Sequence, residues 1–340
     1  MLLSVLMSVY KEDTRYLREA IESILNQTYT DFEFVIVGDT PLSDRERVFG
    51  VIREYALKDR RIKFFPNENN IGLTKSLNVG LSHCSGKYIA RMDADDISVL
   101  TRLEKQVVFM EANPKILASS AWFEFIDEEG NYSGNIVRHI ASAEQICLDI
   151  LKNTVMGHPV SIYRRIINGV EVRYDETFVY AQDYALWVWI LQHGAISNIQ
   201  EVLLYYRLNE NQITTKHTSQ QMECAMRAQR MAFAQLYGFP IVDSFMDVFS
   251  SLTIKNDKDL LEERAMKGFQ DFFARVQVSR KNYHVLKYIM DVYIQHYRHV
   301  TPKKHYQFLY DMTKKNKPLI LACELDYFCQ RLWEIMSGRK

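Results

Sequence analysis

The sequence predicts an α/β fold with a mostly parallel sheet flanked by helices, followed by an all-helical C-terminal region. Strand-like and helix-like segments alternate four times within the first hundred residues, which is typical of a doubly wound sheet. Beyond about residue 217, strand signals nearly vanish while helical periodicity continues. We therefore expect an α/β domain over residues 1–215 and a helical domain over residues 216–340.

The first strand and the first helix have the clearest signals. Residues 2–10, LLSVLMSVY, form the continuous apolar run of a strand that is buried on both faces. Residues 13–29 carry apolar side chains at helical spacing, with Asp13 or Thr14 as the expected N-cap. The start of the chain has no basic segment and no small-residue cleavage signal, so we interpret it as a strand rather than a signal peptide.

The remaining elements are predicted from the same two signals, which are apolar runs for strands and helical spacing of apolar side chains for helices. Strands are expected at 32–39, 62–67 and 87–96, and a strand from residue 116 leads into a turn at Glu129 and Gly130. Helices are expected at 43–59, 72–84 and 101–114, the last stopped by Pro114. In the C-terminal region, helices are expected at 218–238, 242–251, 258–277, 280–298, 303–314 and 319–336.

Composition excludes several classes of protein. The 340 residues contain 42 basic and 42 acidic side chains, so the chain has no excess positive charge that would indicate nucleic-acid binding. The five cysteines are scattered, odd in number and without CxxC spacing, which indicates free thiols in a reducing compartment. No stretch approaches the ~20 apolar residues of a membrane-spanning helix. We therefore expect a cytoplasmic protein.

Three acids follow a buried strand in the segment KYIARMDADDIS, residues 87–98. In an extended chain the side chains of Asp93 and Asp95 point to the same side, at the sheet edge where α/β proteins bind ligands. Two carboxylates with substrate phosphates suit Mg²⁺ or Mn²⁺, and a dication would relieve their repulsion. The alternative is that Asp95 and Asp96 only cap the next helix.

A fourth acid, Asp39, also follows a buried strand, FEFVIVGD. It is expected at the same edge of the sheet, where it could hydrogen-bond a nucleotide base or ribose. A lone Asp after a strand is equally often a turn former, so this alternative stays open.

Several motifs follow one another in order along residues 2–215. They are SVLMSVYKEDTRYLREAIESILNQTYTDFEFVIVGD, NENNIGLTKSLNVGL, GKYIARMDADD, GHPVSIYRR, YAQDYALWVWILQHG and LLYYRLNENQIT. Together they resemble family 2 glycosyltransferases, which are inverting enzymes with the GT-A fold that use nucleotide-diphosphate sugars. The helical region beyond residue 215 resembles no family that we can name.

On the donor side, the resemblance implies that Asp93 faces the ribose and the metal, and that Asp95 is the main metal ligand. It implies that Asp39 contacts the base, usually uracil. The nucleotide pocket is also expected to involve Tyr10 at the end of the first strand and Lys75 beside base and phosphates.

On the acceptor side, the resemblance implies that Asp183 is the catalytic base, whereas the sequence alone favours a plain acid at a helix start. His158 and Gln182 are expected near the acceptor, and a hydrogen-bonded structural role is the alternative for His158. Arg207 is expected at the diphosphate or at a mobile lid.

The sequence departs from the family pattern at three positions. Gln182 stands where the family usually has Glu, which removes a charge beside Asp183. Gly38 replaces a usual first Asp, which puts uracil specificity in doubt. Asn209 stands where many members carry His, so help from that position with metal or phosphate is in doubt.

The predicted function is a metal-dependent inverting glycosyltransferase that moves a sugar from a nucleotide-diphospho-sugar, with UDP-sugars favoured. The expected acceptor is a glycan or lipid-linked glycan in bacterial surface polysaccharide synthesis. One alternative is a nucleotidyl- or phosphotransferase, although neither GxxxxGK[ST] nor GxGxxG follows the first strand. Another is a non-catalytic module that binds sugar nucleotides or polysaccharide.

The C-terminal region also leaves two interpretations open. Its segment SRKNYHVLKYIMDVYIQHYRHVTPKKHYQF is rich in Tyr, Lys and Arg. It can form a helical bundle with solvated basic faces, or a peripheral surface for anionic lipid at the inner face of the cell membrane.

Overall fold

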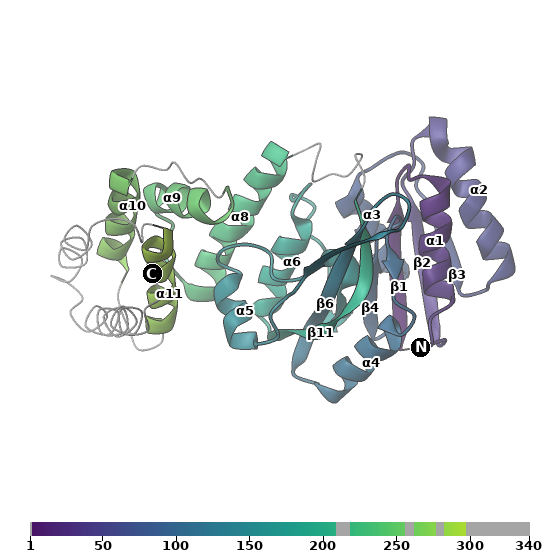
Figure 1. Cartoon of the computed structure of the whole chain (residues 1–340), viewed down its shortest axis with the longest axis horizontal. Coiled ribbons are helices and arrows are strands. Elements are labelled where there is room, and N and C mark those ends of the chain that lie inside the picture. The colour runs from purple at the N-terminus through teal and green to yellow at the C-terminus, as the bar shows by residue number, and fades with distance from the viewer. Residues whose placement is uncertain (1, 209–217, 256–261, 277–281, 297–340) are drawn as a thin grey trace. The chain divides into compact units, whose positions relative to one another are not determined.

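The computed structural model describes residues 2–208, 218–255, 262–276 and 282–296. Two compact units divide the chain, Met1–Ala228 and Gln229–Lys340. Helix and strand alternate through the first unit, and the elements of the second unit are helices in the part that is described (Figure 1). Among the described residues, no helix is both long enough and apolar enough to cross a membrane. The expected helices at 303–314 and 319–336 lie outside the described residues.

Nine of the described strands of the first unit form one sheet in the order β3-β2-β1-β4-β8-β6-β11-β5, with β7 paired to β6. Strands β1–β4 run parallel to one another, as do β6 and β11, whereas β5, β7 and β8 each pair antiparallel. The sheet is therefore mostly parallel, as predicted. Its strands are β1 (Leu3–Val9), β2 (Phe32–Gly38), β3 (Ile62–Pro66), β4 (Tyr88–Met92), β5 (Ile97–Ser98), β6 (Ile116–Ile126), β7 (Tyr132–Val137), β8 (Ile162–Arg164) and β11 (Ala195–Arg207).

Helices α1 to α4 and α6 lie close to their predicted positions, whereas α5 was not predicted. In the first unit they are α1 (Thr14–Leu25), α2 (Leu42–Lys58), α3 (Leu73–His83), α4 (Arg102–Ala112), α5 (Ala143–Asp149) and α6 (Gln182–Leu191). A 3₁₀ turn, η1 (His158–Val160), and a small hairpin, β9 (Ile166–Ile167) with β10 (Val170–Glu171), precede α6. Asp13 is the N-cap of α1, and its side chain accepts a hydrogen bond from the Arg15 amide. This confirms one of the two expected caps.

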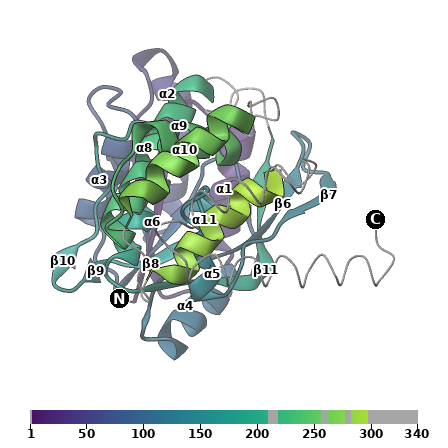
Figure 2. The same ribbon diagram turned by 90° about the vertical axis from the view of Figure 1, so that its left-hand side faces the viewer.

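The two faces of the sheet carry different helices. On β1, Val5 and Met7 belong to the hydrophobic core that α1, α2 and α4 complete. Leu6 points to the opposite face, where a side chain at Gly80 of α3 would collide with it. On β8, Ile162 likewise belongs to the core, and the neighbouring Tyr163 contacts Trp187 of α6. Helices α3 and α6 therefore lie on the face opposite α1 and α4 (Figures 1 and 2).

Helix α8 (Thr218–Tyr237) runs across the division between the units. The second unit further contains α9 (Asp243–Thr253), α10 (Glu262–Arg275) and α11 (Tyr283–His296). Its core is aromatic: Phe233 contacts Phe245, Phe249 and Phe272, and Phe269 contacts Tyr293. This packing fits the expected helical bundle, and no described contact bears on a lipid surface.

Candidate active site

The acidic loop that joins β4 to β5, residues 93–96, forms the centre of the candidate site. Asp93 and Asp95 are half-buried, whereas Asp96 is 1% exposed. Oδ1 of Asp96 accepts a hydrogen bond from the Arg207 amide at 2.9 Å, and its Oδ2 has no hydrogen-bond partner among the described residues. Burial, followed by the charges of Asp95 and Asp93, raises the pKa of Asp96 well above its usual range. Helix α4 begins at Arg102 with Thr101 as its N-cap, so the alternative that Asp95 and Asp96 only cap this helix is wrong.

Asp183 lies in the first turn of α6, as the sequence predicted. The N-cap of this helix is Ala181, which adopts a left-handed conformation with φ of 51°. Burial raises the pKa of Asp183 to about 6; backbone N–H groups at the helix start oppose this, and the charge of Asp93 adds to it. A carboxylate with this pKa is ionised at neutral pH and holds a proton more tightly than an exposed Asp. It therefore suits the role of a general base.

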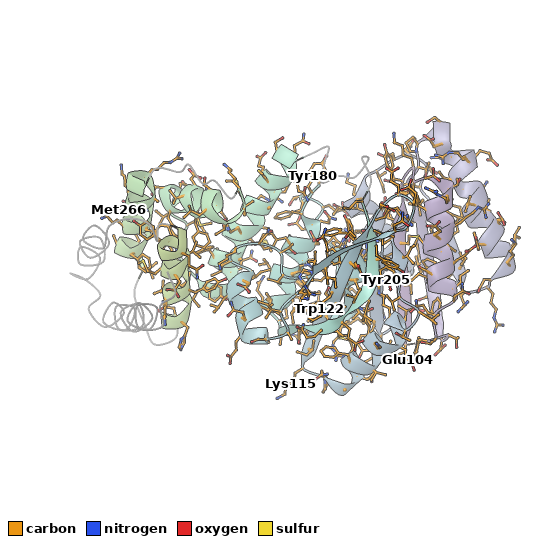
Figure 3. All side chains as sticks on the ribbon, in the orientation of Figure 1. Glu104, Lys115, Trp122, Tyr180, Tyr205 and Met266 are labelled. Carbon is orange, nitrogen blue, oxygen red and sulfur yellow. The ribbon has the colours of Figure 1, made fainter. Side chains whose placement is uncertain are left out.

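Tyr206 on β11 shows that the acids from distant segments share one region. After burial, the charges of Asp96, Asp93, Asp95 and Asp183 each raise the pKa of its hydroxyl. The ring is half-buried and contacts Phe123 and Phe125 of the neighbouring strand β6. On the same pair of strands, Figure 3 labels Trp122 of β6 and Tyr205 of β11. The structure thus brings Asp93, Asp95 and Asp183 together.

Glu12 is a carboxyl group at this site that the sequence did not single out. Its Oε2 accepts a hydrogen bond from the Tyr10 amide at 2.8 Å. Burial, followed by the charge of Asp95, raises the pKa of Glu12 to about 8, with a further contribution from Asp93. Tyr10, a predicted nucleotide contact, follows β1 directly and is 43% exposed, so its ring is accessible to a ligand.

Asp39 follows β2 and is almost fully buried. Its two carboxylate oxygens accept hydrogen bonds at 2.8–2.9 Å from the side chains of Asn67 and Asn70 and from the amides of Ile71 and Gly72. Asp39 thereby anchors the segment that leads into α3. Lys75, the predicted neighbour of base and phosphates, is exposed in the first turn of this helix.

Arg207 ends β11 with its side chain 1% exposed. Its guanidinium donates to the backbone oxygens of Asp95, Asp127 and Glu128 at 2.9–3.1 Å and to the carboxylate of Glu19 at 2.5 Å. These bonds hold the acidic loop against the turn after β6, so Arg207 supports the loop from within. Its predicted contact with the diphosphate stays a prediction. Asn209 lies outside the described residues.

The predicted acceptor residues lie beside Asp183. Gln182 is buried next to it in α6. The His158 ring nitrogen Nε2 lies 2.8 Å from the Tyr174 hydroxyl, and burial together with Arg91 lowers the pKa of His158 well below its usual range. His158 is therefore neutral and hydrogen-bonded, as the structural alternative expected, and Asn78 of α3 fixes the Tyr174 backbone in turn.

The donor atoms of the acidic loop fit a hard dication. Asp93 and Asp95 offer carboxylate oxygens, the ligands that Mg²⁺ and Mn²⁺ prefer. Within residues 2–208 and the described helices beyond them, no group of three or more His, Cys, Asp or Glu is arranged to hold a metal. Mg²⁺ is usually bound by one or two carboxylates together with waters and substrate phosphates, so two protein ligands are sufficient.

Comparisons with known proteins show which family the chain resembles. The model of the family "Glycosyl transferase family 2" matches residues 4–169. The uncharacterized glycosyltransferase MJ1057 of Methanocaldococcus jannaschii is 39% identical over 208 residues, 61% of this chain and 71% of that protein. An Escherichia coli UDP-Gal:alpha-D-GlcNAc-diphosphoundecaprenol beta-1,3-galactosyltransferase is 31% identical over 210 residues, 61% of this chain and 74% of that protein.

A solved structure agrees at the level of the fold. Residues 1–349 of S. aureus TarS in complex with UDP-GlcNAc superpose with a TM-score of 0.57 at 18% identity, covering 88% of this chain and 90% of that one. The fold is therefore the predicted GT-A fold, and the protein is a glycosyltransferase. The chain belongs to glycosyltransferase family 2.

Proposed function

We propose that this glycosyltransferase moves a sugar from a nucleotide-diphospho-sugar, with inversion and with the help of Mg²⁺ or Mn²⁺, to a glycan or lipid-linked acceptor. One observation carries the proposal. Asp93 and Asp95, which follow β4, share one region with Asp183 of α6, and the charge of Asp93 reaches Asp183. The site thus combines ligands for a diphosphate-bound metal with a carboxylate of suitable pKa.

On the donor side, Asp93 and Asp95 would hold the metal and orient the nucleotide diphosphate. The metal, when bound, neutralises charge on the leaving diphosphate. Tyr10 and the segment anchored by Asp39 would line the nucleoside, with exposed Lys75 beside the phosphates. The hydrogen bonds of Asp39 to Asn67 and Ile71 support its role in shaping the segment that would line the nucleoside.

On the acceptor side, Asp183 would accept the proton of the attacking hydroxyl. The bond from the acceptor oxygen to the anomeric carbon forms as the bond from that carbon to the diphosphate oxygen breaks, which inverts the configuration. Burial keeps Asp183 more basic than an exposed Asp, which favours proton transfer. Gln182 and the His158–Tyr174 pair would border the acceptor as neutral groups.

UDP-sugars are the favoured donors because the E. coli relative and the S. aureus structure carry a UDP-sugar in their names. The relative's acceptor is a lipid-linked sugar, which supports a similar acceptor here. Two further relatives, of Erwinia amylovora and Escherichia coli, are named for amylovoran and O-antigen biosynthesis, which supports a role in surface polysaccharide synthesis. Such an acceptor would place the protein at the cytoplasmic face of a membrane, with residues 216–340 as the candidate contact.

A thermal-shift panel tests the donor site. UDP, GDP and their sugars are added with and without Mn²⁺ or Mg²⁺, because a ligand of the native state raises Tm by mass action. The proposal expects a metal-dependent rise with UDP or a UDP-sugar, which is lost in Asp95→Ala. A folded protein whose Tm responds to no nucleotide would contradict the donor assignment and favour a polysaccharide-binding module. Release of inorganic pyrophosphate from a nucleoside triphosphate would instead favour a nucleotidyltransferase.

A further inference from the structure

Three fully buried arginines surround the acidic loop. Arg91, Arg102 and Arg207 are at most 1% exposed and, among the described residues, rank with Trp187 as the largest fully buried side chains. A buried guanidinium is costly unless acceptors surround it, because its charge leaves water. The partners of each arginine therefore show what its charge is used for.

Arg91 points to the face of the sheet that carries α6. Its neighbours on β4, Ala90 and Met92, belong to the core on the opposite face, and side chains alternate along a strand. After burial, the charge of Arg91 lowers the pKa of His158, which lies beside α6 on this face. Arg91 therefore lies beneath the candidate active site, next to the acidic loop.

The partners of Arg91 are few. Its Nη2 donates to Oδ1 of Asp93 at 2.5 Å, and its Nη1 donates to the Met92 oxygen. Its Nε has no hydrogen-bond partner among the described residues. Within that part of the chain, Asp93 is thus the carboxylate that hydrogen-bonds the buried charge of Arg91.

The other two arginines are bound differently. Arg102 donates to the Ser98 hydroxyl at 2.9 Å, to Oε1 of Gln106 at 3.1 Å and to the Arg91 oxygen at 2.5 Å, which are all uncharged acceptors. Arg207 holds the loop through backbone oxygens and the carboxylate of Glu19. Of the three, Arg91 is the one whose described ion pair is with a predicted metal ligand.

We propose that Arg91 is a positioning residue for donor binding. Its hydrogen bond holds Oδ1 of Asp93, so that Oδ2 would be the oxygen that this carboxylate offers to the metal and the ribose of the nucleotide diphosphate. The carboxylate is thereby placed before the ligand arrives, and its charge is balanced although four other acids, Glu12, Asp95, Asp96 and Asp183, lie nearby. This role rests on the proposed function, because it requires that the ligand bound beside Asp93 is a nucleotide diphosphate.

The ion pair itself is tested by unfolding the protein without nucleotide or metal. Asp93→Ala leaves the Arg91 charge buried and unpaired, so Tm should fall by roughly 10 °C. Asp95→Ala removes a carboxylate from the same loop but leaves the Arg91–Asp93 ion pair in place, so Tm should fall less than in Asp93→Ala. Equal effects of the two substitutions would overturn the pairing, whatever the enzyme binds.

The positioning role is tested with Arg91→Lys and Arg91→Met, and Arg102→Lys serves as the matched control for a buried arginine. The readout is the Kd for UDP with Mn²⁺, measured by calorimetry on the full chain at a temperature where each variant is folded. Kd should rise about tenfold in Arg91→Met and about threefold in Arg91→Lys, since a lysine keeps the charge but not the forked geometry. It should change less than twofold in Arg102→Lys.

Other outcomes separate the two proposals. Kd values for Arg91→Lys that match those for Arg102→Lys would reduce Arg91 to a structural residue and overturn the inference. Absence of UDP binding by the unsubstituted protein would refute the UDP assignment, while the unfolding comparison would still decide whether Asp93 and Arg91 form a pair. If Arg91→Met does not fold, Arg91→Lys alone decides the effect on Kd.

Discussion

Asp183 and Asp93 come from α6 and from the end of β4, yet they lie close enough to influence each other. Burial raises the pKa of Asp183 to about 6, and the charge of Asp93 contributes to that value. The predicted base and the predicted donor ligand are therefore neighbours in one electrostatic environment. The first two predictions concern Asp183 itself.

Replacing Asp183 with Asn should abolish transfer and leave donor binding intact. Loss of a general base costs ~10²–10⁴-fold in rate, whereas the proposed nucleotide contacts are made by other residues. The measurement is kcat for sugar transfer together with the Kd for UDP. An unchanged rate, or a rate and a Kd that worsen in parallel, would contradict the assignment of Asp183 as the base.

The pH dependence follows from the same pKa. Below about pH 6 Asp183 is protonated in the folded protein, so kcat/KM should fall tenfold for each pH unit. The folded-state pKa lies above the ordinary value of 3.8, so ionised Asp183 destabilises the fold above pH 6. Asp183→Asn should therefore raise the free energy of unfolding at pH 8 by about 2 kcal/mol, measured with urea. This gain in stability should shrink toward pH 4. A flat rate profile down to pH 5 would exclude this base.

Asp39→Asn should destabilise the protein and weaken nucleotide binding. An amide offers one acceptor oxygen where four donors converge, and its NH₂ group would face other donors. The expected loss is about 2–3 kcal/mol in the free energy of unfolding, measured with urea. Asp31→Asn, at an exposed position before β2, is the control and should change stability by less than ~0.5 kcal/mol.

Arg207→Lys should loosen the acidic loop. A lysine cannot reproduce bonds to three backbone oxygens and to Glu19 from one planar group. Stability should fall by ~2–4 kcal/mol, and the Kd for Mn²⁺–UDP should rise as well. Glu19→Gln keeps the backbone bonds and should have a smaller effect on both quantities. A variant with normal stability but defective UDP binding would favour the direct diphosphate contact instead.

The left-handed residue Ala181, which precedes the base by two positions, gives a fifth prediction. Glycine tolerates φ of 51° without strain, so Ala181→Gly should keep activity and gain ~0.5–1 kcal/mol in stability. A β-branched side chain resists this conformation, so Ala181→Val should lose ~1–3 kcal/mol and displace Asp183, which lowers kcat. Equal kcat values for the Gly and Val variants would show that this turn does not position the base.

The first four strands and the first four helices were predictable because their signals are local, whereas β8, β11 and α5 were not predicted. Apolar runs such as residues 2–10 and the helical spacing after Asp13 depend only on neighbours in the chain. Asp93, Asp95 and Asp39 were recognisable since parallel strands present their ends at one edge of a sheet. Asp183 needed the family motifs, because an acid at a helix start is common.

Other features depend on contacts between distant segments, and the sequence alone did not determine them. Glu12 and Tyr206 belong to the site because the fold brings the segment after β1 and strand β11 close to the acidic loop. Arg91 is one charged residue in an otherwise apolar strand, and its proposed role depends on its complete burial next to Asp93. Burial and charge depend on three-dimensional proximity, which local sequence periodicity does not contain. The sequence thus determined the first four strands and helices, the acids at the strand ends and the family motifs. The tertiary structure decided the order of the strands, which acids lie close together and which arginines hydrogen-bond the acidic loop.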